Sequence, residues 1–211
     1  MDANQREFEN PFGMDLDCEN CTELCGSRER VVHGYGDVGA EFLVVGVAPT
    51  AAAERNGIPF TGAGGGERVQ SMFADLGFVR SALDATEPDV QNVFFTNLTR
   101  CRHPGRDPTD DEVRTCEPFL NAEIRMINPQ IIVPVGERPL RALAVEYTTR
   151  RPDSFDIDAE HATTIRGRGF ELVPMVEPEE LTDERAGEFL EHMRESVLAR
   201  DYRQTKGRQE R

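Results

Sequence analysis

The amino-acid sequence predicts an α/β fold, in which a central, mainly parallel four-stranded sheet carries helices on both faces. Short apolar runs recur along the chain, and each stops at a glycine, a proline or a polar residue. Segments with apolar residues at helical spacing separate these runs. Because the strand and helix patterns alternate, we expect parallel strands whose connections cross the faces of the sheet.

The expected elements follow one another in a regular order. Buried strands are expected at residues 41–47, 90–96, 130–135 and 170–175. Helices are expected at residues 67–76, 108–127, 138–145 and 182–200, and loops at residues 50–66 and 148–162. Thr109 and Glu112 have the spacing of a capping box, so the second of these helices should begin there.

Length and composition limit the class of protein. The chain has 211 residues, which suits one domain, expected at residues 18–200 between a loose leader (1–17) and a polar tail (201–211). The apolar runs are far shorter than the roughly 18 residues that span a bilayer. The polar N-terminus shows no secretory signal. Membrane-spanning, collagenous and disulfide-framework proteins are therefore excluded, and a cytoplasmic monomer is expected.

The chain is strongly acidic. It carries 24 lysine and arginine residues against 39 acidic residues, a net charge of −15, and Lys206 is its sole lysine. This composition is typical of a halophilic protein, because a Debye length of about 3 Å in molar salt screens self-repulsion. A merely acidic cytoplasmic protein is the alternative. Such a chain can bind nucleic acid only through local basic clusters, here Arg100, Arg102, His103 and Arg106, and Arg166 with Arg168.

The cysteines form a pattern that indicates a metal site. They are Cys18, Cys21, Cys25, Cys101 and Cys116. Two pairs far apart in sequence can close one four-thiolate site for zinc or an iron–sulfur cluster. We choose Cys18 and Cys21 as the first pair because C-x2-C is the commoner chelating spacing, with Cys101 and Cys116 as the second. Spacing does not separate zinc from a cluster or establish that Cys25 is the spare; five buried apolar side chains are the alternative.

The ends of the predicted strands select a candidate site. Ligands of parallel α/β sheets bind outside the carboxyl ends of the strands. The residues that follow the four strands should therefore converge on one crevice; they are 46–50, Asn97, 136–137 and 176–179. Asn97 can offer both a donor and an acceptor to the edge of a base. The alternative is a turn residue at a strand end.

Several different short motifs follow one another in a fixed order along the chain. They are Gly46-Val47-Ala48-Pro49, residues 57–64, residues 96–102, Pro108-Thr109, Cys116, Arg166-Gly167 and residues 173–178. The set resembles family 4 uracil-DNA glycosylases, which have a G-E-A-P-G loop, a G-x-P-F-V-G-x-A-G segment, a T-N-x-x-K-C-R segment and a segment ending in H-P-S. The similarity extends over residues 18–200.

The resemblance implies a three-layer α/β/α sandwich and a [4Fe–4S] cluster on Cys18, Cys21, Cys101 and Cys116, with zinc as the alternative. It implies a DNA partner containing uracil or another deaminated base, single-stranded DNA included, whose excision starts base excision repair. The implied substrate-binding residues are Gly46, Val47, Ala48, Pro49, Phe60, Asn97 and Pro178. Phe60 would stack on the base, unless it is a core residue. DNA phosphates would contact Arg100, Arg102, Arg166 and the helix start at Gly64.

Two residues depart from the family pattern. Val47 replaces the acid of the first motif, and valine cannot activate water or stabilise a cationic sugar. Glu177 replaces the histidine of H-P-S, and a carboxylate opposes the negative charge of a departing base. Candidate catalytic acids are Glu54 and a protonated Glu177, both of which are alternatively surface acids. The other outcomes are weak activity, a paralogue that binds damaged or single-stranded DNA without cutting, and a metal-stabilised adaptor without a DNA role.

Overall fold

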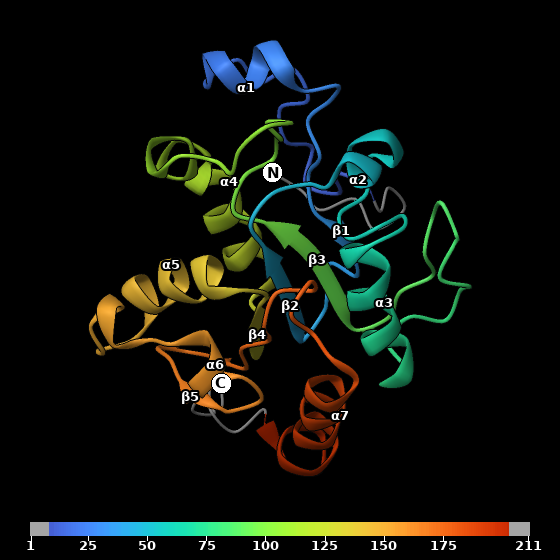
Figure 1. The fold of residues 1–211 in the computed structure, drawn as a ribbon, viewed down its shortest axis with the longest axis vertical. Helices are drawn as coiled ribbons and strands as arrows, with labels where there is room; N and C mark the ends of the chain where they lie inside the picture. The colour runs from blue at the N-terminus through green and yellow to red at the C-terminus, as the bar shows by residue number, and fades with distance from the viewer. Residues whose placement is uncertain (1–8, 203–211) are drawn as a thin grey trace, which may run out of the picture.

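The computed structural model of the protein describes residues 9–202 (Figure 1). Its six-stranded sheet has the order β1-β3-β2-β4-β6-β5. The four central strands are parallel, as predicted; they are β3 (Val93–Asn97), β2 (Phe42–Gly46), β4 (Ile131–Pro134) and β6 (Glu171–Leu172). All four are buried over their whole length because helices cover both faces of the sheet.

Two edge strands extend the predicted sheet. β1 (Tyr35–Gly36) pairs antiparallel with β3, and β5 (Ile165–Arg166) pairs antiparallel with β6. The sequence does not predict these strands, because two residues are too few for an alternating pattern to be recognised.

The long helices form the two outer layers. α4 (Asp110–Ile127) and α5 (Glu137–Tyr147) lie on one side of the sheet in Figure 1. α3 (Gly65–Asp75) and α7 (Asp183–His192), which continues as the π-helical segment η2 (Met193–Leu198), lie on the other side. This arrangement confirms the α/β/α sandwich. Among residues 9–202, none of the helices is both long and apolar enough to cross a membrane.

The capping box at the start of α4 is confirmed. The prediction that residues 50–66 and 148–162 are loops is wrong in part, because both segments contain short helices. The hydroxyl of Thr109 accepts the N–H of Glu112, and the carboxylate of Glu112 accepts the N–H of Thr109. Short helices interrupt the expected loops; they are α2 (Ala51–Asn56), η1 (Pro152–Ser154) and α6 (Ile157–Glu160). A further short helix is α1 (Thr22–Ser27). α2 forms because the Thr50 hydroxyl caps its first turn and the left-handed Gly57 ends it.

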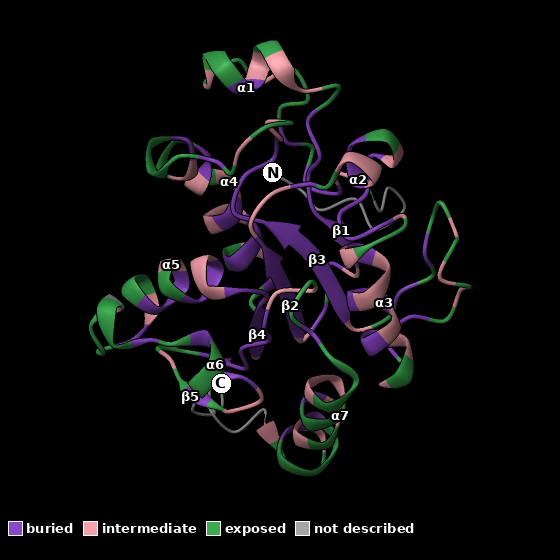
Figure 2. Cartoon of the chain, in the orientation of Figure 1, coloured by how far each residue is buried: buried purple, intermediate pink, exposed green. Residues whose placement is uncertain are grey.

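The buried residues are concentrated in the sheet and on the inner faces of the helices (Figure 2). Part of the segment expected to be a loose leader also belongs to this core. Phe12 is 2% exposed, and its ring lies 5.7 Å from that of Phe94. Met14 is buried as well, whereas residues 1–8 lie outside the described part of the chain. At the other end, Tyr202 packs against Phe42 at the start of the expected tail, and residues 203–211 are not described.

His33 joins the former leader to the core and makes stability pH-dependent. The imidazole is 2% exposed, and its Nε2 lies 2.7 Å from the carbonyl oxygen of Asp15. Burial lowers the pKa of His33 from 6.5 to about 4, and the charge of Arg100 acts in the same direction. The unfolded chain therefore takes up this proton first, so stability is complete above about pH 6.5 and is lost as the pH falls toward 4.

We expect the variant His33→Gln to lose less stability in acid than the wild-type protein. The expected difference is about 3 kcal/mol of unfolding free energy between pH 7 and pH 4, because each pKa unit corresponds to about 1.4 kcal/mol. Urea unfolding at pH 7, 5.5 and 4 measures it. Measurements at pH 8, where the imidazole is neutral in both states, give the baseline difference between the proteins. If the unfolding free energies of the two proteins fall equally as the pH is lowered, the lowered pKa of His33 is contradicted.

Candidate functional site

The carboxyl ends of the central strands meet in one crevice, as the sequence predicts. Gly46, at the end of β2, pairs with Asn97 at the end of β3. Val135 and Met175, just beyond β4 and β6, form the next bridge along the same edge. The connection from β2 leads to β3 on one side, and the connection from β4 leads to β6 on the other. The crevice therefore opens at the topological switch point between β2 and β4, where α/β sheets bind ligands.

Three of the predicted substrate-binding residues meet at this point. A Cβ atom built on Gly46 would lie 2.5 Å from Oδ1 of Asn97 and 2.8 Å from Cζ of Phe60. The absence of a side chain at Gly46 therefore allows the carboxamide and the ring to approach each other over the end of β2. Gly66, in the first turn of α3, lies close to the backbone of Phe60. A Cβ atom at position 66 would lie 2.7 Å from the carbonyl carbon of Phe60, so a side chain there would displace it.

Phe60 adopts a strained backbone conformation. Its φ angle is 57°, in the left-handed region that a bulky side chain rarely occupies. Such a conformation costs about 1–3 kcal/mol and is found mainly at functional sites. The ring is 9% exposed and packs against Phe95 at a centroid distance of 5.7 Å. Phe60 is thus both a boundary of the core and a wall of the crevice.

Asn97 has a buried donor without a partner. Its side chain is buried, and within residues 9–202 its Nδ2 makes no hydrogen bond. An unpartnered buried donor costs about 1–3 kcal/mol, so it is expected where a ligand completes the hydrogen bond. The pyrimidine edge of a base has the acceptor oxygens that this donor requires.

The first-motif turn supplies backbone and apolar groups but no acid. The carbonyl of Val47 accepts the N–H of Thr99 at 3.1 Å, which fixes the turn to the segment after β3. The side chain of Val47 is half-buried; Ala48 is also half-buried, and Pro49 is buried. The side chains of this turn are therefore unable to orient a water molecule.

Glu177 lies over the end of β4. A Cβ on Gly136 would be 2.8 Å from Oε1 of Glu177, so the carboxylate lies directly against this glycine. Burial raises the pKa of Glu177 above its ordinary value, and the neighbouring acids Glu180 and Glu179 raise it further. The next residue, Pro178, faces α3, because a Cβ on Gly65 would lie 2.8 Å from its Cβ.

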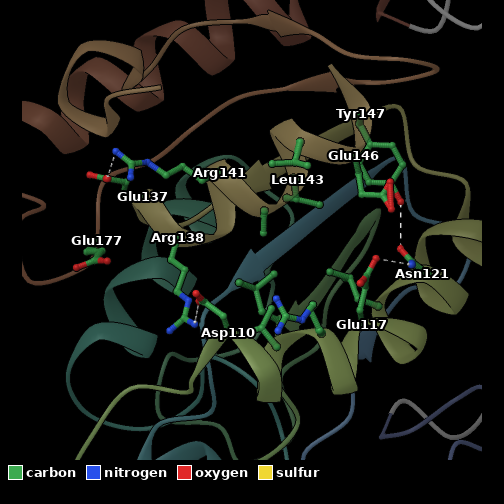
Figure 3. Close-up of a pocket in the computed structure, with 16 residues that line it drawn as sticks. Asp110, Glu117, Asn121, Glu137, Arg138, Arg141, Leu143, Glu146, Tyr147 and Glu177 are labelled. Carbon is green, nitrogen blue, oxygen red and sulfur yellow. Dashed lines mark hydrogen bonds and ion pairs between the residues drawn. The ribbon is translucent and has the colours of Figure 1, made fainter. Parts of the chain in front are cut away.

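Two grooves open on either side of the segment 177–179. The first, of about 850 Å³, lies between α4 and α5 and has Glu177 at one end (Figure 3). Figure 3 shows the ion pairs Arg138–Asp110 and Arg141–Glu137 along this groove. The second groove, of about 840 Å³, lies between α3 and α7 and is lined by Gly64, Gly65, Pro178 and Glu179, among others. The start of α3, which the sequence analysis selected as a phosphate site, thus faces an open groove.

The candidate acid Glu54 is engaged in a structural contact. It is 2% exposed, and its Oε1 accepts the backbone N–H of Glu29 at 2.9 Å. Its Oε2 lies 3.8 Å from a guanidinium nitrogen of Arg102. The carboxylate therefore connects α2 to the N-terminal segment, and the expectation that it replaces the missing acid of the first motif is not supported by its position.

The predicted phosphate-binding arginines do not form one basic surface. Arg100 is 1% exposed, so it cannot contact DNA, and this part of the prediction is wrong. Arg106 binds Glu112 and Glu23, while Arg102 is partly exposed beside Glu54. Arg166 is exposed and lies in β5, where its backbone is opposite Glu171 at the amino end of β6, away from the crevice. The local basic cluster that the sequence indicates is largely neutralised by folding.

The four cysteines chosen from the sequence line a single small cavity. Cys18, Cys21, Cys101 and Cys116 surround a space of about 20 Å³, together with apolar side chains and two arginines. Cys25 is not among the lining residues; its thiol donates to the carbonyl oxygen of Cys18 at 3.5 Å. Cys18 and Cys21 lie just before α1, of which Cys21 is the N-cap, and α4 contributes Cys116.

Burial keeps the thiols of this cavity protonated unless they bind cations. Burial raises the pKa of Cys101 to about 11, and it also raises the pKa values of Cys21 and Cys116. The thiols are therefore neutral unless bound cations compensate the charge of the thiolates. Among residues 9–202, no three cysteine, histidine or acidic side chains converge closely enough to hold a single ion.

Sequence reasoning missed three residues that orient the site. Glu123 binds Arg100 behind Asn97, and Arg28 donates to the sulfur atoms of Cys25 and Cys101. The Nδ1 of His161 accepts the N–H of Val176 at 3.1 Å and so holds the segment that carries Glu177. No local sequence signal identifies these residues, because each contacts a partner from a distant segment.

Comparison with known proteins adds an independent observation. The family model of the uracil DNA glycosylase superfamily matches residues 33–198. The type-4 uracil-DNA glycosylase of Sulfurisphaera tokodaii is 37% identical over 122 residues, which cover 57% of this chain and 50% of that protein. The type-4 uracil-DNA glycosylase of Archaeoglobus fulgidus is 29% identical over a region that covers 74% of this chain and 69% of that protein. The type-5 uracil-DNA glycosylase of Mycobacterium bovis is 35% identical over a region that covers 56% of this chain and 53% of that protein. The chain thus spans about half the length of the first and third relatives.

Proposed function

The chain belongs to the uracil-DNA glycosylase superfamily, and we propose that it recognises and excises uracil or another deaminated base from DNA. This reaction would be an initiating step of base excision repair. The observation that carries the proposal is the meeting of Phe60 and the unpartnered Asn97 donor over Gly46, at the switch point of the sheet. In this proposal the protein acts as a monomer in the cytoplasm, and molar salt is its working solvent.

Base recognition follows from these groups. A base inside a duplex is unreachable, so the target nucleotide must leave the stack or already be single-stranded. The ring of Phe60 then provides a stacking wall, and Asn97 donates to a carbonyl oxygen of the base while its own Oδ1 accepts a ring N–H. Thymine presents the same edge with an added methyl group, so discrimination against it depends on the space around Phe60.

Glycosidic cleavage would rest on Glu177. With valine at position 47, the first motif provides no carboxylate for water or for the cationic sugar. A protonated Glu177 can donate to the departing base, and its raised pKa extends the protonated form toward neutral pH. Deaminated purines benefit most from such a donor, because protonation assists their departure. Base release should therefore increase as the pH falls.

DNA backbone contacts would lie along the groove between α3 and α7. Gly64 is the N-cap of α3 and has no side chain that could accept the first N–H groups of the helix, and both Gly64 and Gly65 line the groove. Backbone N–H groups at the start of a helix bind phosphate oxygens without a cationic side chain. This mode of binding suits a protein with a net charge of −15.

We further propose that Cys18, Cys21, Cys101 and Cys116 hold a [4Fe–4S] cluster, with zinc as the alternative occupant. Such a cluster would fasten the segment containing α1 to the loop that follows β3. The backbone N–H of Arg100 donates to Cys116 at 3.2 Å, and Arg28 donates to Cys101 at 3.4 Å. Hydrogen bonds of this kind stabilise thiolate ligands. The role is structural, because the cavity is separate from the crevice residues.

A second candidate is a DNA-binding paralogue that does not cut. Two observations favour it, namely the valine in place of the first-motif acid and the carboxylate in place of the H-P-S histidine. Single-turnover base release separates the two candidates. The substrates are single-stranded oligonucleotides carrying uracil, hypoxanthine or xanthine, in molar KCl with the metal centre intact. Release of any one supports excision, whereas binding without release supports the paralogue.

Asn97→Ala is expected to reduce discrimination for uracil over cytosine by roughly 100-fold, because the donor and acceptor that match the uracil edge are lost together. Competition binding of single-stranded oligonucleotides measures it. The matched control is Asn121→Ala, whose carboxamide bonds to Glu117 and Tyr147 in the groove between α4 and α5. An equal effect of both variants would contradict the role of Asn97.

A further inference from the structure

We propose that Arg100 and Glu123 are positioning residues for base recognition, which orient the backbone of Asn97 and connect it to the cysteine-lined cavity. This inference rests on the proposed function, because it assigns a purpose to the orientation of Asn97. Neither residue touches the crevice. Both act through the peptide groups at the end of β3.

The pair is a fully buried ion pair. Each side chain is 1% exposed, and a guanidinium nitrogen of Arg100 lies 2.7 Å from Oε2 of Glu123. The same carboxylate accepts the hydroxyl of Thr96 at 2.6 Å and the backbone N–H of Gly34 at 3.1 Å. Glu123 therefore fastens α4 to the end of β3 and to the segment before β1.

The second guanidinium nitrogen of Arg100 holds the peptide group that follows Asn97. It donates to the carbonyl oxygen of Asn97 at 2.8 Å. The N–H of the same peptide group, on Leu98, donates to the carbonyl oxygen of Gly46 at 2.8 Å. The peptide plane is thus fixed at both its acceptor and its donor. Because the carboxamide Nδ2 of Asn97 has no hydrogen-bond partner in the described part of the chain, its direction depends on this backbone.

The same residue reaches the cysteine-lined cavity. The backbone N–H of Arg100 donates to the sulfur of Cys116, which lies on α4 two turns before Glu123. Helix α4 therefore holds Arg100 at two points, through a sulfur and through a carboxylate. A displacement of Cys116 would move the residue that orients Asn97.

Stability alone does not account for this arrangement. Removing two charges from water is costly, and uncharged replacements of buried ion pairs are often at least as stable. What an uncharged pair lacks is the directed donor to the Asn97 carbonyl. The double variant Arg100→Met/Glu123→Gln tests this difference. Its glutamine retains an acceptor for Gly34 and gains a donor for Thr96, while the donor to Asn97 is lost.

The measurements use full-length protein loaded with its metal. The probe is a single-stranded oligonucleotide carrying 2′-fluoro-2′-deoxyuridine, whose glycosidic bond resists hydrolysis, with 2′-fluoro-2′-deoxycytidine in its place as reference. The affinity ratio is the affinity for the uridine probe divided by the affinity for the reference. We expect this ratio to fall at least about tenfold in the double variant, while its thermal midpoint and metal content stay near those of the wild-type protein. The single variant Glu123→Gln should lower the midpoint by roughly 10 °C, because Arg100 is then buried without a counter-charge.

Two further variants complete the design. Arg100→Lys retains the charge and one donor, so it should keep the affinity ratio within about threefold of wild type. Arg200→Met breaks the ion pair with Glu171 at the amino ends of the strands and should lower stability without changing the ratio. Should the double variant fail to fold, Arg100→Leu/Glu123→Gln replaces it with the same expectation.

An unchanged ratio in a folded uncharged pair would overturn the proposal. If the wild-type protein itself does not discriminate between the probes, the proposed function fails separately. The positioning role is then decided by the side-chain carboxamide NMR signal of Asn97, assigned by its loss in Asn97→Ala. A signal that shifts in the uncharged pair but not in Arg200→Met supports the role, and an unmoved signal overturns it.

Discussion

Replacing Glu177 with histidine is expected to raise the rate of uracil release by tenfold or more. A leaving uracil carries negative charge, and a carboxylate about 4 Å away opposes it by up to about 4 kcal/mol at an effective dielectric constant of 20. This opposition corresponds to an upper limit of roughly three decades in rate. Because Glu177 is only half-buried, solvent screening brings the expected gain toward the lower end.

The pH profile provides a second readout of the same substitution. The raised pKa of Glu177 means that its protonated form, which donates rather than repels, persists further toward neutral pH. Wild-type release should therefore fall as the pH rises through this pKa, whereas Glu177→Gln should be far less pH-dependent. Single-turnover rates between pH 5 and 8 measure both effects.

Glu195→His is the control, because it introduces histidine at an exposed position of η2 that is not among the residues lining either groove. It should leave the rate near that of the wild-type protein. A folded, metal-loaded Glu177→His variant that releases uracil no faster would contradict the leaving-group argument. The protein would then depend on binding and on strain in the bound nucleotide.

Removing one cysteine of the cavity is expected to have the second large effect. Cys18→Ser should lose the bound metal and lower the thermal midpoint by roughly 10 °C, because a structural metal site contributes several kcal/mol to folding. Cys25→Ser should retain the metal and the thermal midpoint of the wild-type protein, because Cys25 does not line the cavity. Iron, sulfide and zinc analysis of protein purified without oxygen, together with thermal unfolding, measures the outcome.

The two serine variants form a matched pair, since both change a half-buried thiol of the same short segment. Metal loss in Cys25→Ser with retention in Cys18→Ser would show that the ligand set is wrong. Zinc at one ion per chain, without sulfide, would replace the cluster by a mononuclear site. That result would leave the fastening role of the four cysteines intact.

Local sequence patterns determined the central elements of this fold. The runs that form β2 and β4 are apolar throughout, so a buried parallel strand is their simplest interpretation. Thr109 and Glu112 define the start of α4 through contacts between neighbouring residues. Helix α2 was within reach of the same reasoning, because Thr50 caps a run of three alanines and Gly57 ends it.

The strand-end rule selected the residues of the crevice without any knowledge of their contacts. It selected Gly46 and Asn97 because both follow buried strands, and the structure places them together with Phe60. The motif spacing also separated Cys18 and Cys21 from Cys25, in agreement with the lining of the cavity. These inferences succeed because strand direction and short chelating spacings are properties of the chain itself.

Tertiary structure alone decided how each charge is used. From the sequence, Arg100 belongs to a basic cluster and Glu54 is a free acid; the fold buries both against partners from other segments. Phe12 likewise enters the core from a polar segment that contains few other apolar residues. A single sequence specifies which side chains can pair, but the partner is chosen by the packing of elements distant along the chain. The sequence therefore determined the sheet, its crevice and the cysteines that line the small cavity, and the tertiary structure decided which charged groups pair with one another.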